Sequence, residues 1–218
     1  GKILSPMHIV ENLKEYVTEV GPSKIGQSAE TVESSVIGPW ISEDALWDCL
    51  TCGACEQVCP VGVEHLDMIV DMRRHLVMER SEMPEQAVSV LTNMEQRGHP
   101  WKGTQYTRTD WAEGLGVTQI ADNPDTDILL WIGCTSALEQ RSQRVARAMV
   151  SVLKHADVDF SILGSEETCT GDPARRMGNE YLYQSMARKT IDVLKKHSFK
   201  TIVTLCPHCF NVMKNEYP

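Results

Sequence analysis

Apolar residues in the first half of the chain recur at helical spacing. Ser5 and Pro6 supply an N-cap and a first helical position, and apolar residues then repeat every three or four positions up to Gly21. Residues 22–39 are rich in Ser, Gly and Thr without clear periodicity, so we expect a loop there. The same helical spacing predicts further helices over 44–49, 64–80 and 84–97.

The second half of the chain changes to short apolar runs that alternate with amphipathic helices. The run 127–133 is apolar and ends in glycine, which is typical of a buried parallel strand. Two further strands are predicted over 159–163 and 201–205, and two helices over 136–156 and 180–197. This β-α-β-α-β order predicts an α/β domain with a short parallel sheet.

The expected fold class is therefore α+β in two parts. We expect an α-helical domain over 1–97 and an α/β domain over 126–218. Residues 98–125 contain six Gly or Pro residues and little periodicity, so we expect a linker there. The length of 218 residues fits this division, at roughly 100–200 residues for each domain.

Composition and charge limit the partners and the cellular location that we expect for the protein. The formal net charge is −9, which disfavours nucleic acid as a partner because nucleic-acid binding usually needs a basic surface. No G-x-G-x-x-G run or Walker A loop supports nucleotide binding. The sequence shows no signal-peptide pattern and no run near the ~18–20 apolar residues that cross a bilayer. We expect a cytoplasmic, reducing location, because the eight cysteines are clustered and the chain is long enough to bury its own core.

Four of the eight cysteines form one compact run. Cys49, Cys52, Cys55 and Cys59 follow the spacing C-x2-C-x2-C-x3-C and are closed by Pro60, which is the run found in bacterial ferredoxins. Two-residue gaps let three thiolates reach three corners of one cubane cluster. A zinc knuckle is the alternative, but zinc sites usually pair two C-x2-C elements at a distance. The spacing therefore favours [4Fe–4S] ligands.

This run does not complete a cluster by itself. In two-cluster ferredoxins the fourth cysteine of such a run binds the other cluster. Cys49, Cys52 and Cys55 then need a fourth ligand, and Cys59 needs three partners. The sequence has no second run of this type. We expect that the partner motif lies upstream, in a parent protein longer than this chain.

The other four cysteines are spread over the second half, at Cys134, Cys169, Cys206 and Cys209. Cys134 and Cys206 come just after predicted strands, at the carboxyl ends where open α/β sheets place their sites. We expect the four thiolates to converge on one metal site. Cys206-Pro-His208-Cys209 is also compatible with a thioredoxin-like redox pair, although such a pair does not require the two distant cysteines. His208 is not expected to be a ligand.

The segments around these cysteines carry a resemblance to a known family. They are Gly133-Cys134-Thr135, the stretch from Cys169 to Glu180, Cys206 to Asn211, and Lys214 to Tyr217. They resemble the first cysteine-rich (CCG) domain of the heterodisulfide reductase-like iron–sulfur oxidoreductases. The ferredoxin run and the opening Gly1-Lys2-Ile3-Leu4-Ser5-Pro6 are similar to the same family.

The resemblance implies an electron-transfer function. It implies a helical ferredoxin-type domain ahead of two CCG domains, with [4Fe–4S] clusters as cofactors. The branch that the chain most resembles is implied to pass electrons from electron-transferring flavoprotein to menaquinone. More broadly, the implied partners are a flavoprotein or hydroxyacid dehydrogenase as electron donor and a quinone or membrane subunit as acceptor. The implied parent protein is associated with the cytoplasmic face of the membrane.

Two alternatives to electron relay remain open at this stage. Disulfide-reducing members of the family carry two adjacent cysteines before a glycine, and here the second position is Thr170. The first alternative is a heterodisulfide reductase subunit. The threonine at position 170 counts against it, because the second of the two adjacent cysteines is missing there. A zinc-stabilised structural domain is the second.

Arg175 and Arg176 follow Cys169 closely and are candidates for the cluster environment. Positive charge near a cluster favours its reduced form and raises its potential. The alternative is that these arginines are solvated or pair with an acid such as Glu180.

Overall fold

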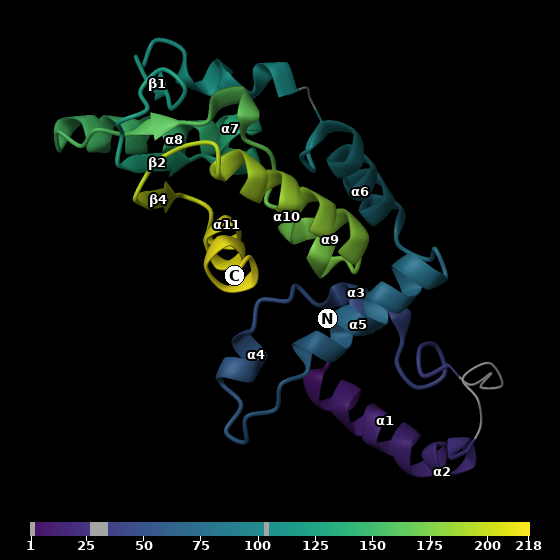
Figure 1. Cartoon of the computed structure of the whole chain (residues 1–218). Coiled ribbons are helices and arrows are strands. Elements are labelled where there is room, and N and C mark those ends of the chain that lie inside the picture. The colour runs from purple at the N-terminus through teal and green to yellow at the C-terminus, as the bar shows by residue number, and fades with distance from the viewer. Residues whose placement is uncertain (1–2, 27–34, 103–104) are drawn as a thin grey trace. The chain divides into compact units, whose positions relative to one another are not determined.

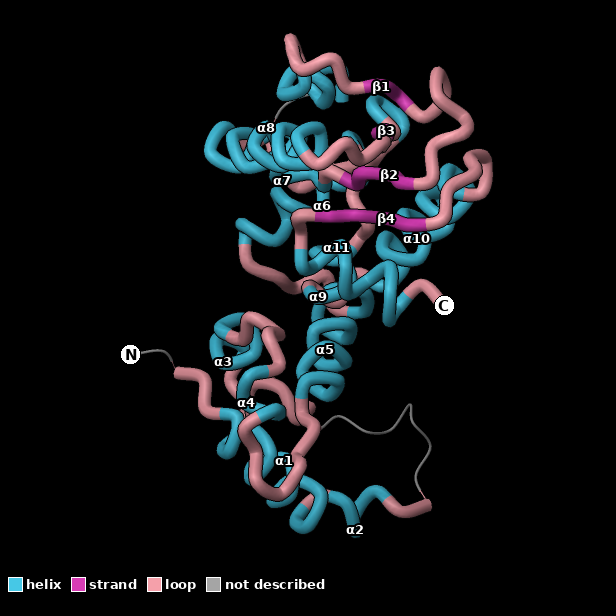
Figure 2. The backbone as a smooth tube through the Cα atoms, turned by 90° about the vertical axis from the view of Figure 1, so that its left-hand side faces the viewer, coloured by secondary structure: helices cyan, strands magenta, loops and turns pink. Residues whose placement is uncertain are grey.

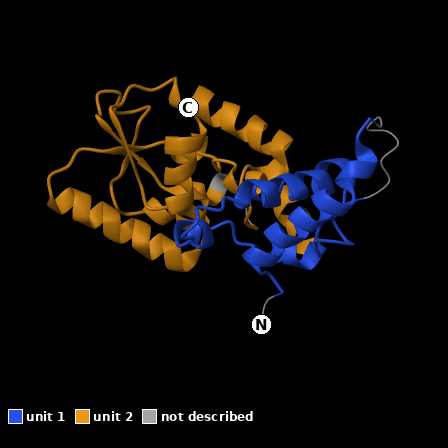
Figure 3. Ribbon diagram, turned by 90° about the horizontal axis from the view of Figure 1, so that it is seen from below, with its two compact units in different colours: residues 1–84, 176–178 blue, residues 85–175, 179–218 orange. Residues whose placement is uncertain are grey.

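The protein is described here by a computed structural model that covers residues 3–26, 35–102 and 105–218. The chain divides into two compact units, shown in different colours in Figure 3. Unit 1 comprises Gly1–Pro84 together with Arg176–Gly178, and unit 2 comprises Glu85–Arg175 together with Asn179–Pro218. Part of the loop predicted over 22–39 lies outside the described residues.

Unit 1 consists of helices, as the pattern of its apolar residues predicts (Figure 1). The Ser5 hydroxyl accepts a hydrogen bond from the backbone N–H of His8 at 3.4 Å, which confirms the predicted N-cap. A short helix, which was not predicted, follows the first one directly. The elements are α1 (Pro6–Glu19), α2 (Gly21–Lys24), α3 (Glu43–Asp48), α4 (Ala54–Gln57) and α5 (Leu66–Arg74), which continues as a π-helical turn (His75–Glu79).

The segment predicted as a linker, 98–125, lies in unit 2. It contains a 3-10 helix (Gln105–Ala112) and strand β1 (Thr118–Gln119), neither of which was predicted. Trp111 is 3% exposed and belongs to the core of this unit. Gly98, Gly114 and Gly116 have positive φ, which suits the turns between these short elements. Helix α6 (Glu85–Arg97), expected in the first domain, also lies in unit 2.

A parallel sheet forms the centre of unit 2. Its strands lie in the order β1-β3-β2-β4, which can be followed from top to bottom in Figure 2. All three pairs of neighbouring strands are parallel. This confirms the predicted fold class. Besides β1, the strands are β2 (Ile128–Trp131), β3 (Ser161–Ile162) and β4 (Thr201–Thr204).

Both faces of the sheet are buried. Leu130 packs on one face with Ala146 and Val150 of helix α8 (Gln140–His155). Leu129 and Trp131 point to the other face, where the core includes residues of helix α10 (Glu180–Leu194). The apolar run in β2 is continuous because alternate residues serve opposite faces, and each face is covered by helices.

Short helices follow the strand ends. One helix was predicted over 136–156, but the chain breaks it at Glu139, whose backbone is extended. The Glu139 carboxylate caps α8 by accepting hydrogen bonds from the N–H groups of Arg141 at 3.1 Å and Ser142 at 2.8 Å. The short elements are α7 (Gly133–Leu138), the 3-10 turn Gly164–Glu166, α9 (Asp172–Arg176), α11 (Pro207–Asn211) and a final π-helical turn (Val212–Glu216).

Over 3–26, 35–102 and 105–218, no helix has both the length and the apolar character that a bilayer span needs.

Replacing Leu130 by alanine tests the importance of this doubly buried strand. Leu130 is fully buried, so Leu130→Ala should lower the free energy of unfolding by about 2–5 kcal/mol. Val152→Ala on α8 is the control, because Val152 is 62% exposed and its loss should change stability by less than about 0.5 kcal/mol. Urea unfolding followed by far-UV circular dichroism measures both. Equal losses for the two variants would contradict this account of the core.

Candidate metal centres

The two central strands bring two cysteine loops to one edge of the sheet. β2 and β4 are paired in register up to Trp131 and Thr204, so their carboxyl ends lie side by side. Cys134 follows the end of β2 and Cys206 follows the end of β4. The two cysteines therefore emerge at neighbouring points of the same edge, as the sequence predicted.

Gly133 allows these two loops to approach closely. Its φ is +79°, a conformation that favours glycine. A Cβ atom added to Gly133 would lie 3.5 Å from Cys206 Cβ and 3.6 Å from Cys209 Sγ. The backbone just before Cys134 thus packs against the Cys206–Cys209 loop.

The four cysteines of unit 2 interact as two pairs of thiols. A hydrogen bond from the Cys169 thiol lowers the pKa of Cys134, and the same contact together with burial raises the pKa of Cys169. In the second pair, the hydrogen bond from Cys209 lowers the pKa of Cys206 to about 6, helped by backbone N–H groups, while the pKa of Cys209 is raised. In each pair, one cysteine has a lowered pKa, which favours the thiolate, the form that binds metals.

The chemistry of this set fits a four-iron cluster. Cys169 and Cys209 are 3% and 4% exposed, so water is largely excluded from two of the four sulfurs. Within the described part of the chain, no group of three or more His, Cys, Asp and Glu side chains surrounds the position of a single ion. A single-ion site is not what a [4Fe–4S] cluster needs. In such a cluster each thiolate binds a different iron, so the four sulfurs lie farther apart than ligands of one ion.

In unit 1, three of the four cysteines of the ferredoxin run have a defined local partner. The N–H of Thr51 donates to Cys49 Sγ at 3.3 Å, and the N–H of Val63 donates to Cys59 Sγ at 3.4 Å. Backbone N–H groups, Val63 first, lower the pKa of Cys59. Cys52 is exposed, and Cys55 contacts a histidine described below. Cys59 and Cys49 thus accept hydrogen bonds from different loops. This agrees with the expectation that the two cysteines bind different clusters.

The first buried polar residue that sequence reasoning missed is Arg73. It is 4% exposed and donates to the carbonyl oxygens of Leu46 (3.1 Å from Nε) and Cys49 (2.6 Å from Nη2). It lies on the buried face of α5 with Ile69 and Met72, and no motif in the sequence signals these hydrogen bonds. Arg73 therefore fixes the backbone at which the run begins.

The second missed feature is a His–Glu pair beside Cys55. His65 is 3% exposed, and its Nε2 lies 3.2 Å from Cys55 Sγ. Glu56 Oε1 accepts from the N–H groups of His65 at 2.6 Å and Leu66 at 2.7 Å, and so holds the start of α5. Both residues lie in or just after the run, but spacing alone does not show that they fold back onto it.

The third missed feature is a buried ion pair in unit 2. Arg108 and Glu167 are each 2% exposed and pair through Arg108 Nη2 and Glu167 Oε1. The Glu167 carboxylate also accepts hydrogen bonds from the N–H groups of Ile132 at 3.1 Å and Gly133 at 2.7 Å. No motif in the sequence signals this pair, because its members are 59 residues apart.

The two arginines predicted to lie in the cluster environment make different contacts. Arg175 pairs with Glu216 at 2.6 Å and lies over the Tyr183 ring. Arg176, which belongs to unit 1, donates from Nη1 to the carbonyl and hydroxyl oxygens of Thr51, both at 3.1 Å. Thr51 lies between Cys49 and Cys52 in the sequence, so Arg176 contacts the backbone of the ferredoxin run.

His208 lies between two cysteines but is engaged elsewhere. Its Nδ1 lies 3.0 Å from Asp172 Oδ2, and its side chain is 60% exposed. The contact links the loop after Cys169 to the loop that holds Cys206 and Cys209.

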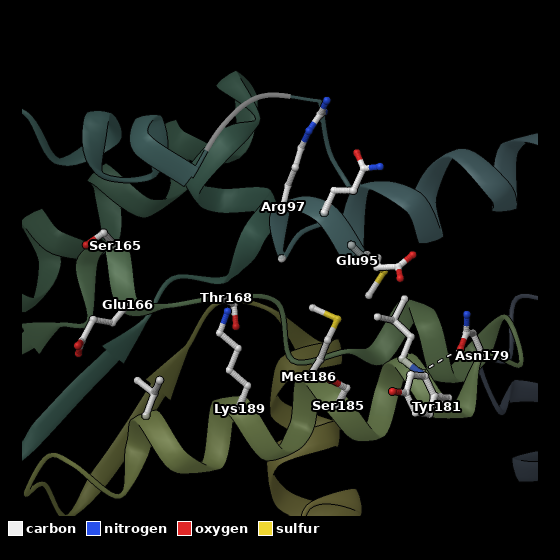
Figure 4. A pocket seen from close by; sticks show the side chains of 15 residues that line it. Glu95, Arg97, Ser165, Glu166, Thr168, Asn179, Tyr181, Ser185, Met186 and Lys189 are labelled. Carbon is white, nitrogen blue, oxygen red and sulfur yellow. Dashed lines mark hydrogen bonds between the residues drawn. The ribbon is translucent and has the colours of Figure 1, made fainter.

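A pocket of about 840 Å³ lies between α6 and α10 of unit 2 (Figure 4). Arg97, Lys189 and Ser185 are among its lining residues, and none of the eight cysteines is. Asn179 caps α10 at its rim by accepting a hydrogen bond from the N–H of Leu182 at 3.0 Å.

Two family models match the chain, one in each half. A model described as a 4Fe-4S dicluster domain matches residues 8–63, and one described as a cysteine-rich (CCG) domain matches residues 128–214. No solved structure matches the chain.

Curated relatives match the chain over its full length. A probable membrane-anchored ferredoxin of Chromohalobacter salexigens is 44% identical, and the chain covers 34% of it. The probable iron-sulfur-binding oxidoreductase FadF of Bacillus subtilis is 34% identical (36% covered), as is the EtfAB:quinone oxidoreductase of Syntrophomonas wolfei (34% covered). The chain thus spans about a third of the length of these relatives.

A ferredoxin-type run and a cysteine-rich α/β unit together define an iron–sulfur protein, whose cofactors are [4Fe–4S] clusters. Within that class, the chain belongs to the CCG-domain, heterodisulfide reductase-like iron–sulfur oxidoreductases. The resemblance inferred from the cysteine motifs is confirmed.

The difference between the two thiols of the C-x2-C pair gives a testable prediction for the metal-free chain. With its pKa lowered to about 6, Cys206 is a thiolate above that pH and becomes protonated as the pH falls through it. Iodoacetamide should therefore alkylate Cys206 with a midpoint near pH 6, whereas Cys209, whose pKa is raised, should stay unreactive at neutral pH. Peptide mass spectrometry after short pulses measures both rates. The urea-unfolded chain is the control, and identical pH profiles in the folded chain would refute the pairing.

Proposed function

We propose that the chain is the electron-relay segment of a larger oxidoreductase, and that Cys134, Cys169, Cys206 and Cys209 hold one [4Fe–4S] cluster. The observation that carries this proposal is the meeting of the loops that contain these four cysteines at one edge of the sheet. Gly133 packs against two of them, and the thiols interact in pairs. Four thiolates complete the ligand set of one such cluster.

In unit 1 we assign Cys49, Cys52 and Cys55 to three corners of a second cluster and Cys59 to a neighbouring one. The spacing of the run supports this assignment. Arg73 and Glu56 would hold the backbone on either side of the run. The remaining ligands would come from a part of the parent protein outside this chain.

A bound cluster accepts and releases one electron at a time and spreads its charge over several irons. The residues of the chain would hold it, exclude water and set its potential through hydrogen bonds and nearby charge. Arg176 would contribute positive charge beside the ferredoxin run, whereas the charge of Arg175 is paired with that of Glu216.

For the direction of electron flow we propose a flavoprotein donor and a quinone or membrane-subunit acceptor. One relative is named as an EtfAB:quinone oxidoreductase and another as a probable membrane-anchored ferredoxin. A parent protein at the cytoplasmic face of the membrane would suit both names.

Disulfide reduction is less well supported by the residues present. At the position of the second adjacent cysteine stands Thr170, which is 1% exposed, and its hydroxyl lies 4.0 Å from Cys209 Sγ. Tyr217 fixes the same residue by donating to its carbonyl oxygen at 2.8 Å. The site therefore offers no fifth thiol at this position.

Counting iron tests the cluster in unit 2. The chain, purified and reconstituted without oxygen, should bind about four irons and four sulfides at this site and give an EPR signal after dithionite reduction. Cys206→Ser should abolish that signal. Cys52→Ser, which changes the exposed cysteine of the other unit, is the matched control and should leave it in place. Bound zinc without iron or sulfide after attempted reconstitution would instead indicate a structural metal site.

Electron flow is tested with the parent protein. Reduced electron-transferring flavoprotein should reduce its clusters, and a quinone should reoxidise them, in stopped-flow absorbance measurements. Clusters that form but accept no electron from the reduced flavoprotein would refute the proposed donor and leave the cluster assignment intact.

A further inference from the structure

The Arg108–Glu167 ion pair lies at the junction of the cysteine loops of unit 2. Ile132 and Gly133, whose N–H groups donate to the Glu167 carboxylate, directly precede Cys134. Glu167 itself stands two residues before Cys169. One carboxylate thus ties together the loops of two cysteines, and Gly133 in turn packs against Cys206 and Cys209.

The Arg108–Glu167 pair is costly to bury, because both charged side chains are removed from water. Both side chains are 2% exposed, and two charges removed from water are stabilising only with good geometry and full hydrogen bonding. Glu167 meets this requirement with its two backbone donors and Arg108. Arg108 does not, because its Nη1 is buried without a hydrogen-bond partner within the described residues.

The two charges lie beside the cysteine loops with opposite signs. The Glu167 carboxylate accepts from the N–H groups of the two residues that directly precede Cys134, and Arg108 is paired with that carboxylate. Nearby His99 is fully buried, and burial followed by the charge of Arg108 lowers its pKa, so it adds no positive charge at neutral pH. Arg108 and Glu167 are therefore buried charges of opposite sign at the junction of the cysteine loops.

We propose that Arg108 and Glu167 are a pair of positioning residues that set the reduction potential of the cluster held by Cys134, Cys169, Cys206 and Cys209. The inference rests on the proposed function. Glu167 fixes the cysteine loops through backbone N–H groups, and Arg108 balances its charge. The pair is nearly neutral as a whole, so removing one member exposes the field of the other to the buried cluster. Reduction adds one electron from dithionite and neither forms nor breaks a bond in this pair.

Opposite shifts on removing the two charges test the proposal. Glu167→Gln leaves the positive charge of Arg108 unbalanced and should raise the potential, because positive charge favours the reduced cluster. Arg108→Gln leaves the negative charge of Glu167 unbalanced and should lower the potential. We expect each single variant to change the ratio of oxidised to reduced cluster at a fixed potential about tenfold, which equals ~59 mV for one electron.

An EPR-monitored redox titration of the full reconstituted chain measures these shifts. The double variant, which removes both charges, should return most of the way to the wild-type potential, because the two effects oppose each other. Shifts of the same sign in both single variants, or no shift with iron content intact, would overturn the proposal. A wild-type chain that binds no iron would instead refute the proposed function, so the two failures are distinguishable.

Charge-conserving variants cover the case in which a glutamine variant fails to assemble the cluster. Arg108→Lys and Glu167→Asp keep both charges, and circular dichroism of the metal-free chains reports whether they fold. A bound cluster with a potential close to wild type in these two variants would support the role of charge. Loss of iron from folded Arg108→Lys as well would show that packing alone matters and would overturn the proposal.

Discussion

The parallel pairing of β2 with β4, buried on both faces, is the constraint on which unit 2 depends. Four consecutive residue pairs hold the two strands in register, and helices cover the core on either side. Parallel strands end at the same edge, so the chain must place the loops of Cys134 and Cys206 next to each other. The convergence of distant cysteines follows from this pairing and not from any property of the loops themselves.

Buried charged side chains hold the backbone of the cysteine loops in place. In unit 2, Glu167 satisfies two backbone N–H groups that would otherwise be buried without partners. In unit 1, the buried Arg73 donates to the carbonyl oxygens of Leu46 and Cys49. Each unit thus uses a buried charge to fix the backbone that carries its cysteines, which suits sites where the position of a sulfur must be held closely.

The thiols themselves differ in character although all eight are cysteines. The pKa is lowered in Cys134 and Cys206, which favours their thiolates, and raised in the buried Cys169 and Cys209, which favours their thiols. Metal ligation requires thiolates, so cluster assembly is coupled to the packing that buries two of these thiols. An electron-relay segment benefits from such burial, because exclusion of water and fixed hydrogen bonds both tune the potential of a cluster.

Cysteine spacing, apolar periodicity and the strand–helix order are local properties of the chain, so the ferredoxin run, the helical first unit and the parallel sheet could all be predicted from them. The place of residues 98–125 in unit 2 could not be predicted in this way, and neither could the contacts of Arg73, His65, Arg108 and Glu167. The partners of these residues are brought close only by folding. The hydrogen bonds and ion pairs that stabilise their buried polar groups therefore leave no pattern in the spacing of the sequence.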